Sequence, residues 1–217
     1  MRLLFLDFAS ISNLNMKFEL QKKKALEKYQ KAKESGEVDR EIIELLDFLN
    51  SLPNLYTTSS CAGRIMLLQE FGAKKKDHKI KAKWHSPVKW EEFLKALEEI
   101  KEGLIWLKQE PFILHVVGKT LANVQKILKV ALEIGFKHSG IFVFEEERYI
   151  LEINGTQTLS LPIKKANKLL IPLDYLKFVF ELAIKKLERN REARERFFER
   201  LRKEFDTIPP SSRTQSL

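Results

Sequence analysis

The chain has 217 residues, of which 44% are hydrophobic and 32% are charged, and its formal net charge is +9. This length suits one substantial domain or two small ones. The one cysteine, Cys61, excludes an internal disulfide and argues against a structural zinc site, so we expect an intracellular, cytoplasmic protein. No apolar run approaches the length of a membrane span, and the positive charge favours an anionic partner such as nucleic acid.

Helices are expected in the first quarter of the chain. Apolar spacing and the breaker Ser35-Gly36 predict a first helix at 17–34, which leaves residues 1–15 as an N-terminal extension. Asp39 is suited to cap a second helix near 40–50. The apolar residues of this region recur at helical spacing, at Val38, Ile42, Leu45, Leu46 and Leu49.

Strand patterns follow in the middle of the chain. Residues 56–60 are rich in Thr and Tyr and are expected to be extended, and the apolar run 65–68 predicts a buried strand. A basic loop at 73–79 precedes residues 80–85, which alternate between apolar and polar side chains. Helical spacing returns at 90–101.

The second half mixes both element types. It contains, in order, a strand at 112–117, a helix from Thr120 to Ile134 ended by Gly135, a hairpin of strands 141–144 and 149–153, a strand that ends near Pro162, and a long helix at 173–205. The remaining tail at 207–217 is expected to be disordered. Thus the sequence predicts an α+β fold, a single domain at 16–206 with a mixed β-sheet flanked by helices. The segments 56–97 and 137–182 repeat a strand–helix order weakly.

The densest polar segment is 57–64, which holds four hydroxyls, a thiol, Gly63 and Arg64 between two apolar runs. Small side chains leave backbone N–H groups accessible, and a guanidinium suits a carboxylate or a phosphate. The segment therefore predicts an anion or cofactor site, and the alternative is a strand end that caps itself. The lack of a G-x-G-x-x-G sequence argues against a standard Rossmann methyltransferase or nucleotide site.

Aromatic and imidazole side chains offer further candidates. Trp84 could stack on a base or belong to the core, while His85 lies on the polar side of its strand. His115, inside an apolar strand, is either a satisfied core residue or part of a cleft beside Cys61 and His85. Cys61 could act as a nucleophile with a His base. The spacing of Cys61 and the histidines matches no local metal motif, so no metal is expected.

Four segments together resemble one family, the tRNA wybutosine-synthesising protein 3 family. They are 46–64 (LDFLNSLPNLYTTSSCAGR), 83–85 (KWH), 106–115 (WLKQEPFILH) and 135–141 (GFKHSGI). The resemblance covers about residues 17–205 and implies a SAM-dependent methyltransferase (S-adenosyl-L-methionine as cofactor) that methylates N4 of the tricyclic wybutosine precursor in tRNA-Phe. The Lys/Glu-rich composition is typical of proteins from hot environments and favours an archaeal member.

The resemblance also implies one shared cleft. In it, Ser59, Ser60, Gly63, Arg64, Ser139 and Gly140 would hold the cofactor, His85, His115 and Cys61 would act in catalysis, and Lys83, Trp84 and Arg148 would contact the RNA substrate. Two alternatives remain, a non-catalytic tRNA-binding module and a hydrolase or transferase with Cys61 as nucleophile. The sequence does not indicate the oligomeric state.

Overall fold

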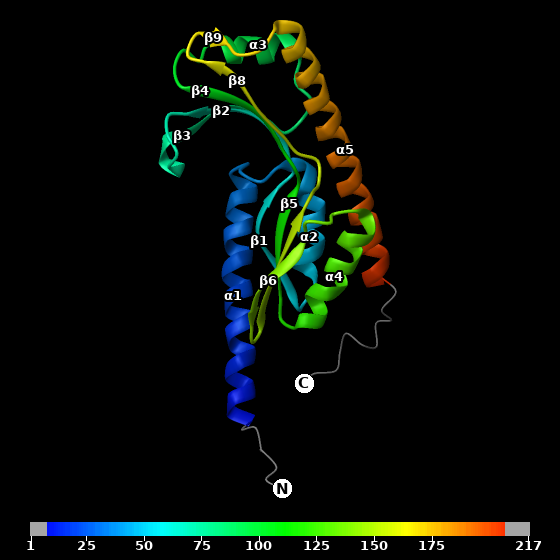
Figure 1. Cartoon of the computed structure of the whole chain (residues 1–217). Coiled ribbons are helices and arrows are strands. Elements are labelled where there is room, and N and C mark those ends of the chain that lie inside the picture. Colours follow the sequence, from blue (N-terminus) through cyan, green and yellow to red (C-terminus); the bar gives the residue numbers. More distant parts are fainter. Residues whose placement is uncertain (1–7, 207–217) are drawn as a thin grey trace. The chain divides into compact units, whose positions relative to one another are not determined.

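A computed structural model describes residues 8–206 of the chain, so the predicted tail and the first seven residues of the predicted extension lie outside it. The chain forms two compact units (Figure 1). Unit 1 contains the chain up to Ser60, Ile113–Asn154 and the chain from Phe197, and unit 2 contains Cys61–Phe112 and Gly155–Arg196.

Unit 1 is built on a four-stranded antiparallel sheet of order β1-β5-β7-β6. Its strands are β1 (Leu55–Cys61), β5 (Ile113–Gly118), β6 (Gly140–Glu145) and β7 (Arg148–Asn154). Its helical elements are α1 (Phe8–Glu34), η1 (Arg40–Ile42), α2 (Ile43–Ser51), α4 (Leu121–Ile134) and the end of α5 (Leu173–Asp206). Helix α1 runs alongside this sheet in Figure 1.

Helices pack on both faces of the unit 1 sheet. On one face, Phe18 of α1 is fully buried against Tyr56, Val117 and Ile150. Leu114, whose side chain alternates with that of Val117 along β5, is fully buried on the other face. Helix α4 packs over strands β5, β6 and β7 on that face. His115 therefore shares the Val117 face of β5, as strand alternation predicts, and points away from the α4 layer.

Unit 2 is built on a five-stranded antiparallel sheet of order β3-β2-β4-β8-β9. Its strands are β2 (Arg64–Glu70), β3 (His78–Trp84), β4 (Leu104–Glu110), β8 (Leu159–Lys165) and β9 (Lys168–Leu169). Helix α3 (Trp90–Glu98) and the first part of α5 complete the unit, and a short helical turn, η2 (Lys75–Asp77), precedes β3.

A cluster of aromatic rings fills the core between the helices and the sheet of unit 2. The rings of Phe93 and Phe180 lie 4.7 Å apart, and Trp90 stacks on Phe93 at 5.6 Å. Beside this cluster, the buried Lys164 donates hydrogen bonds to the carbonyls of Leu97 (2.7 Å) and Ile100 (2.6 Å). The Lys164 ammonium thus adds hydrogen bonds to carbonyl groups at and just beyond the end of α3.

Most of the predicted elements are present, and the α+β class is confirmed. Four differences stand out. Helix α1 begins at Phe8, nine residues before the predicted start at 17, so it runs through part of the predicted extension. Asp39 precedes η1, but its side chain makes no capping hydrogen bond. Strand β4, which the sequence analysis did not predict, occupies the centre of the unit 2 sheet, and the strands divide into two antiparallel sheets where one mixed sheet was expected.

Candidate functional site

Three side chains from neighbouring strands of unit 1 form a hydrogen-bonded chain. Ser59 Oγ lies 2.5 Å from His115 Nδ1, and His115 Nε2 lies 2.8 Å from Glu152 Oε2. Ser59 is exposed, and the side chains of His115 and Glu152 are 26% and 38% exposed. Solvent and a ligand can therefore reach this Ser59–His115–Glu152 chain, which is the strongest constellation for acid–base chemistry in unit 1.

The hydrogen-bond partners indicate which tautomer a neutral His115 imidazole adopts. An ionised Glu152 only accepts hydrogen bonds, so neutral His115 carries its proton on Nε2 and donates it to Glu152. Nδ1 then holds the lone pair and accepts the Ser59 hydroxyl. Such an arrangement makes the imidazole a proton acceptor, because the carboxylate orients the ring and stabilises the imidazolium that forms.

Sheet register brings these residues together. His115 and Glu152 are direct partners on β5 and β7, and β5 also borders β1, which carries Ser59. The exposed ring of Phe142 on β6 lies 5.5 Å from the His115 ring. The sheet therefore presents a carboxylate, an imidazole and a hydroxyl beside an exposed aromatic ring.

Ser59 also borders a pocket of about 360 Å³, which we call the α1–β1 pocket. All of its lining residues belong to unit 1: Ala25, Lys28, Tyr29, Ala32, Glu37, Val38, Leu46, Thr57, Thr58, Ser59 and Ser60. Two of the predicted cofactor residues, Ser59 and Ser60, are among them. The polar segment of β1 thus forms one side of the pocket, and residues of α1 form another.

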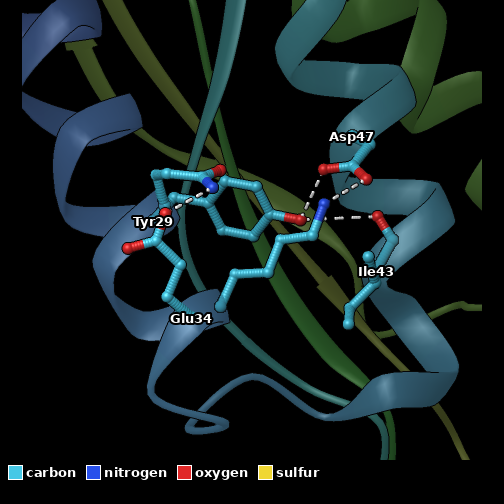
Figure 2. Close-up of polar contacts among 6 residues, drawn as sticks. Tyr29, Glu34, Ile43 and Asp47 are labelled. Atoms are coloured by element: carbon cyan, nitrogen blue, oxygen red, sulfur yellow. Dashed lines mark hydrogen bonds and ion pairs between the residues drawn. The ribbon is translucent and has the colours of Figure 1, made fainter.

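A polar network fixes the Tyr29 wall of the pocket (Figure 2). The Tyr29 hydroxyl donates a 2.7 Å hydrogen bond to Asp47 on α2, and Lys33 forms an ion pair of 2.7 Å with the same carboxylate. Burial and the neighbouring Asp47 carboxylate both raise the pKa of the Tyr29 phenol, so its hydroxyl stays a donor. Partial burial would raise the pKa of Asp47, but hydrogen bonds from Lys33 and Tyr29 outweigh it and hold that pKa below its usual range.

This network makes a prediction for the pH dependence of stability. Since the folded-state pKa of Asp47 is depressed, its contribution is present above the unfolded-state pKa and is lost as the pH falls below about 4. We expect Asp47→Asn to lower the free energy of unfolding by about 0.5 kcal/mol at pH 7, a small effect because the pair is partly exposed. In urea unfolding, the difference in the free energy of unfolding between wild type and Asp47→Asn should be smaller at pH 3 than at pH 7. The control variant Glu27→Gln, at an exposed position, should match wild type at both pH values.

Unit 2 gathers a second set of predicted residues around the turn that joins β1 to β2. His85 Nδ1 donates to the carbonyl of Gly63 at 3.2 Å, so the lone pair of the neutral imidazole lies on Nε2. A ring nitrogen of His85 and the Cys61 sulfur lie within 4.8 Å of each other. Gly63 has φ of +95°, and a Cβ there would collide with the Asn190 amide, so the turn requires glycine.

Two predicted residues of unit 2 have structural partners. Arg64 forms an ion pair with Glu110 at 2.8 Å, which occupies part of the guanidinium fork that was expected to bind an anion. Trp84 is partly buried against the unit 2 core, 6.1 Å from the Phe93 ring, and its indole N–H donates to Glu92 at 2.7 Å. These contacts favour the alternative that Trp84 belongs to the core.

The other predicted residues lie at strand ends and edges. Ser139 Oγ accepts the Asn154 N–H at 3.1 Å, and Gly140 begins β6 opposite Glu152. Arg148 pairs with Glu145 across the hairpin at 2.9 Å, and Lys83 is exposed on the edge strand β3.

Three functional or structural features were not predicted from the sequence: Glu152, the pocket side of α1 and Asn190. Glu152 carried a signal, because it is the one acidic residue within the predicted strand 149–153. For Tyr29 and Lys28 of α1, the sequence contains no signal of a functional role beyond their helical pattern. Asn190, which is buried and contacts three separate segments of unit 2, lies in a polar stretch of helix that gives no hint of this role.

Comparisons with known proteins agree on one family. The model of the family "Methyltransferase TYW3" matches residues 20–203. A relative from Pyrococcus furiosus, named tRNA(Phe) 7-((3-amino-3-carboxypropyl)-4-demethylwyosine(37)-N(4))-methyltransferase 2, is 39% identical over 86% of this chain and 89% of its own. The protein of Pyrococcus abyssi that carries the same name with the number 1 is 37% identical over 85% of this chain and 95% of its own.

Solved structures show the same fold. The PH1069 protein of Pyrococcus horikoshii superposes with a TM-score of 0.80 at 34% identity and covers 85% of this chain and 95% of its own. A hypothetical protein from Aeropyrum pernix superposes with a TM-score of 0.66 at 27% identity, over 76% of this chain and 98% of its own. Within residues 8–206, none of the helices combines the length and the apolar character needed to cross a membrane.

Proposed function

Because the chain belongs to the methyltransferase TYW3 family, we propose that it methylates N4 of a 4-demethylwyosine derivative at position 37 of tRNA(Phe). The methyl donor of this reaction is S-adenosyl-L-methionine, and the reaction takes place in the cytoplasm. The net charge of +9 supports an RNA substrate, because cationic side chains neutralise phosphates and release counterions.

The observation that carries this proposal is the position of Ser59. This residue belongs both to the Ser59–His115–Glu152 chain and to the lining of the α1–β1 pocket. A proton acceptor thus lies beside a cavity of about 360 Å³, within the size range of small-molecule sites. Methyl transfer to nitrogen can use both features, the cavity for a bound substrate and the proton acceptor for the proton that leaves N4.

The chemistry assigns a role to each residue of the chain. S-adenosyl-L-methionine, when bound, supplies an electrophilic methyl group, and its sulfur keeps the electron pair of the broken carbon–sulfur bond. As the new N–C bond forms, N4 loses its proton to the Ser59 hydroxyl, which passes its own proton to His115 Nδ1. Glu152 stabilises the resulting imidazolium through Nε2–H. Alignment of the two substrates contributes more to the rate than the base does.

The remaining predicted residues keep supporting roles in this proposal. Ser60, Ser139 and Gly140 line or flank the reacting region in unit 1. In unit 2, Gly63 and Arg64 shape the turn after β1, His85 and Cys61 lie beside it, and Lys83 and the partly exposed Trp84 offer contacts for RNA. Arg148, in unit 1, offers another. Separate replacement of Arg64 and His85 tests whether the unit 2 residues act in the reaction, and full activity in both variants would exclude them.

Mass spectrometry of the modified nucleosides of tRNA(Phe) tests the function. Demethylwyosine-containing tRNA is incubated with the protein and S-adenosyl-L-methionine carrying a trideuterated methyl group. We expect a mass gain of one labelled methyl group on the position-37 nucleoside. Unmodified guanosine at position 37 serves as the control acceptor and should gain none. A tRNA that binds the protein without gaining methyl would instead favour the non-catalytic tRNA-binding module.

The proximity of Cys61 and His85 supports a second candidate, a reaction with the Cys61 thiolate as nucleophile. Alkylation of Cys61 with iodoacetamide, followed on the intact protein by mass spectrometry, separates the two candidates. Complete alkylation that leaves tRNA methylation intact dismisses the nucleophile. Loss of methylation that the Cys61→Ser variant also shows, with tRNA binding retained, would support it.

A further inference from the structure

We infer that the α1–β1 pocket holds the methyl donor, with its adenine ring against Tyr29 and its amino-acid end near Lys28. This inference rests on the proposed function, because it assigns a place to the donor of that reaction. It departs from the sequence analysis, which assigned the donor to a set of residues that includes Gly63, Arg64 and Gly140. Only Ser59 and Ser60 are common to both assignments.

The walls of the pocket suit a flat heteroaromatic ring. Apolar side chains supply much of the lining: Ala25, Ala32, Val38 and Leu46. The small side chains of Ala25 and Ala32 leave space along the surface of α1, and the Tyr29 ring borders that space. The Tyr29 hydroxyl donates to the Asp47 carboxylate, and Lys33 pairs with the same carboxylate. The Tyr29 ring is therefore held in place before any ligand binds (Figure 2). A fixed aromatic wall costs less conformational entropy on binding.

The rim of the pocket carries groups of both signs. Lys28 and Glu37 are exposed lining residues, and the hydroxyls of 57–60 lie along the strand side. A phosphate-rich ligand would meet repulsion from the Glu37 carboxylate, whereas a zwitterion with a ribose diol would find a partner for each of its groups. A nucleoside that bears an amino acid meets this description, and Ser59 lies where such a ligand would meet the proton acceptor.

Filling the pocket tests its occupancy without removing any polar group. Ala32→Phe places a ring into the cavity from α1, and Gln30→Phe adds the same ring at an exposed position of the same helix that does not line the pocket. Isothermal titration of the full chain with S-adenosyl-L-homocysteine measures binding without methyl transfer. We expect at least a tenfold higher Kd for Ala32→Phe and a change of less than about twofold for Gln30→Phe.

The charge at the rim gives a second, gentler test. Lys28→Ala should raise the Kd of S-adenosyl-L-homocysteine about fivefold but leave that of adenosine unchanged, because adenosine has no carboxylate. Lys23→Ala, an exposed lysine on α1 outside the lining, controls for net charge and should change neither. Equal effects of Lys28→Ala on both ligands would overturn the placement of the amino-acid end. Lys28 is exposed, so this variant stays informative if Ala32→Phe does not fold.

The outcomes separate this inference from the function on which it rests. If wild type binds S-adenosyl-L-homocysteine and Ala32→Phe binds it equally well, the pocket assignment is wrong and the methyltransferase stands. The assignment also fails if tRNA is methylated but millimolar S-adenosyl-L-homocysteine does not bind. If wild type neither binds it nor methylates tRNA, the proposed function itself is wrong.

Discussion

Replacement of His115 by Ala is expected to lower kcat for tRNA methylation about 10²-fold, the lower end of the range for general base catalysis. His115 joins Ser59 to Glu152, so its loss removes the group that takes the Ser59 proton when the Ser59 hydroxyl accepts the N4 proton. His115 does not line the α1–β1 pocket, and KM for the methyl donor should stay within about twofold of wild type. Steady-state kinetics with labelled donor measures both constants.

Two further variants make this result specific. His138→Ala removes an exposed imidazole near the start of β6 and should leave kcat unchanged. Glu152→Gln keeps the size of the side chain but removes the negative charge that stabilises the imidazolium, so we expect a loss of about tenfold. If His115→Ala folds normally and retains wild-type kcat, the proton acceptor is another group and the Ser59–His115–Glu152 chain has a structural role.

The second large effect is on stability, where Asn190→Ala is expected to lower the free energy of unfolding by about 3 kcal/mol. Asn190 is buried, accepts the Phe112 N–H at 2.8 Å and donates to the Ala62 carbonyl at 3.0 Å. Removal of the amide deletes both hydrogen bonds in a buried region and leaves a small cavity. Urea unfolding measures the change, and the exposed neighbour Arg189→Ala should shift it by less than about 0.5 kcal/mol.

A pair of glycine variants tests the contact between Asn190 and the turn at Gly63. Gly63 and Gly36 both have positive φ, +95° and +72°, so alanine is strained at each. Only at Gly63 would the added Cβ also meet Asn190 and nearby backbone, while nothing lies within 4 Å of a Cβ at Gly36. We expect Gly63→Ala to cost about 2 kcal/mol more than Gly36→Ala. Equal costs would show that the Asn190 contact adds nothing to the backbone strain.

The sequence predicted structural features that depend on neighbouring residues better than features that depend on residues far apart in the chain. The stripe of α2 and the cap and stop of α4 at Thr120 and Gly135 are local features, and the structure confirms them. Strand β4 was missed although its residues alternate between buried and half-buried, because the buried set includes the polar Gln109 and the alternation is diluted by charged neighbours. Its place at the centre of a sheet comes from pairing with β2 and β8, which lie far away in the chain.

The sequence by itself determined the α+β class, the family and the polar residues of β1 and β5 as candidates, since these follow from local pattern and residue identity. Only the tertiary structure decided that Ser59 and His115 meet with Glu152, because strand register brings together residues 56 and 37 positions apart. It also decided the pocket, which exists because α1 and β1 leave a space between small side chains and hydroxyls. Such contacts depend on packing between distant segments, which no local sequence pattern encodes.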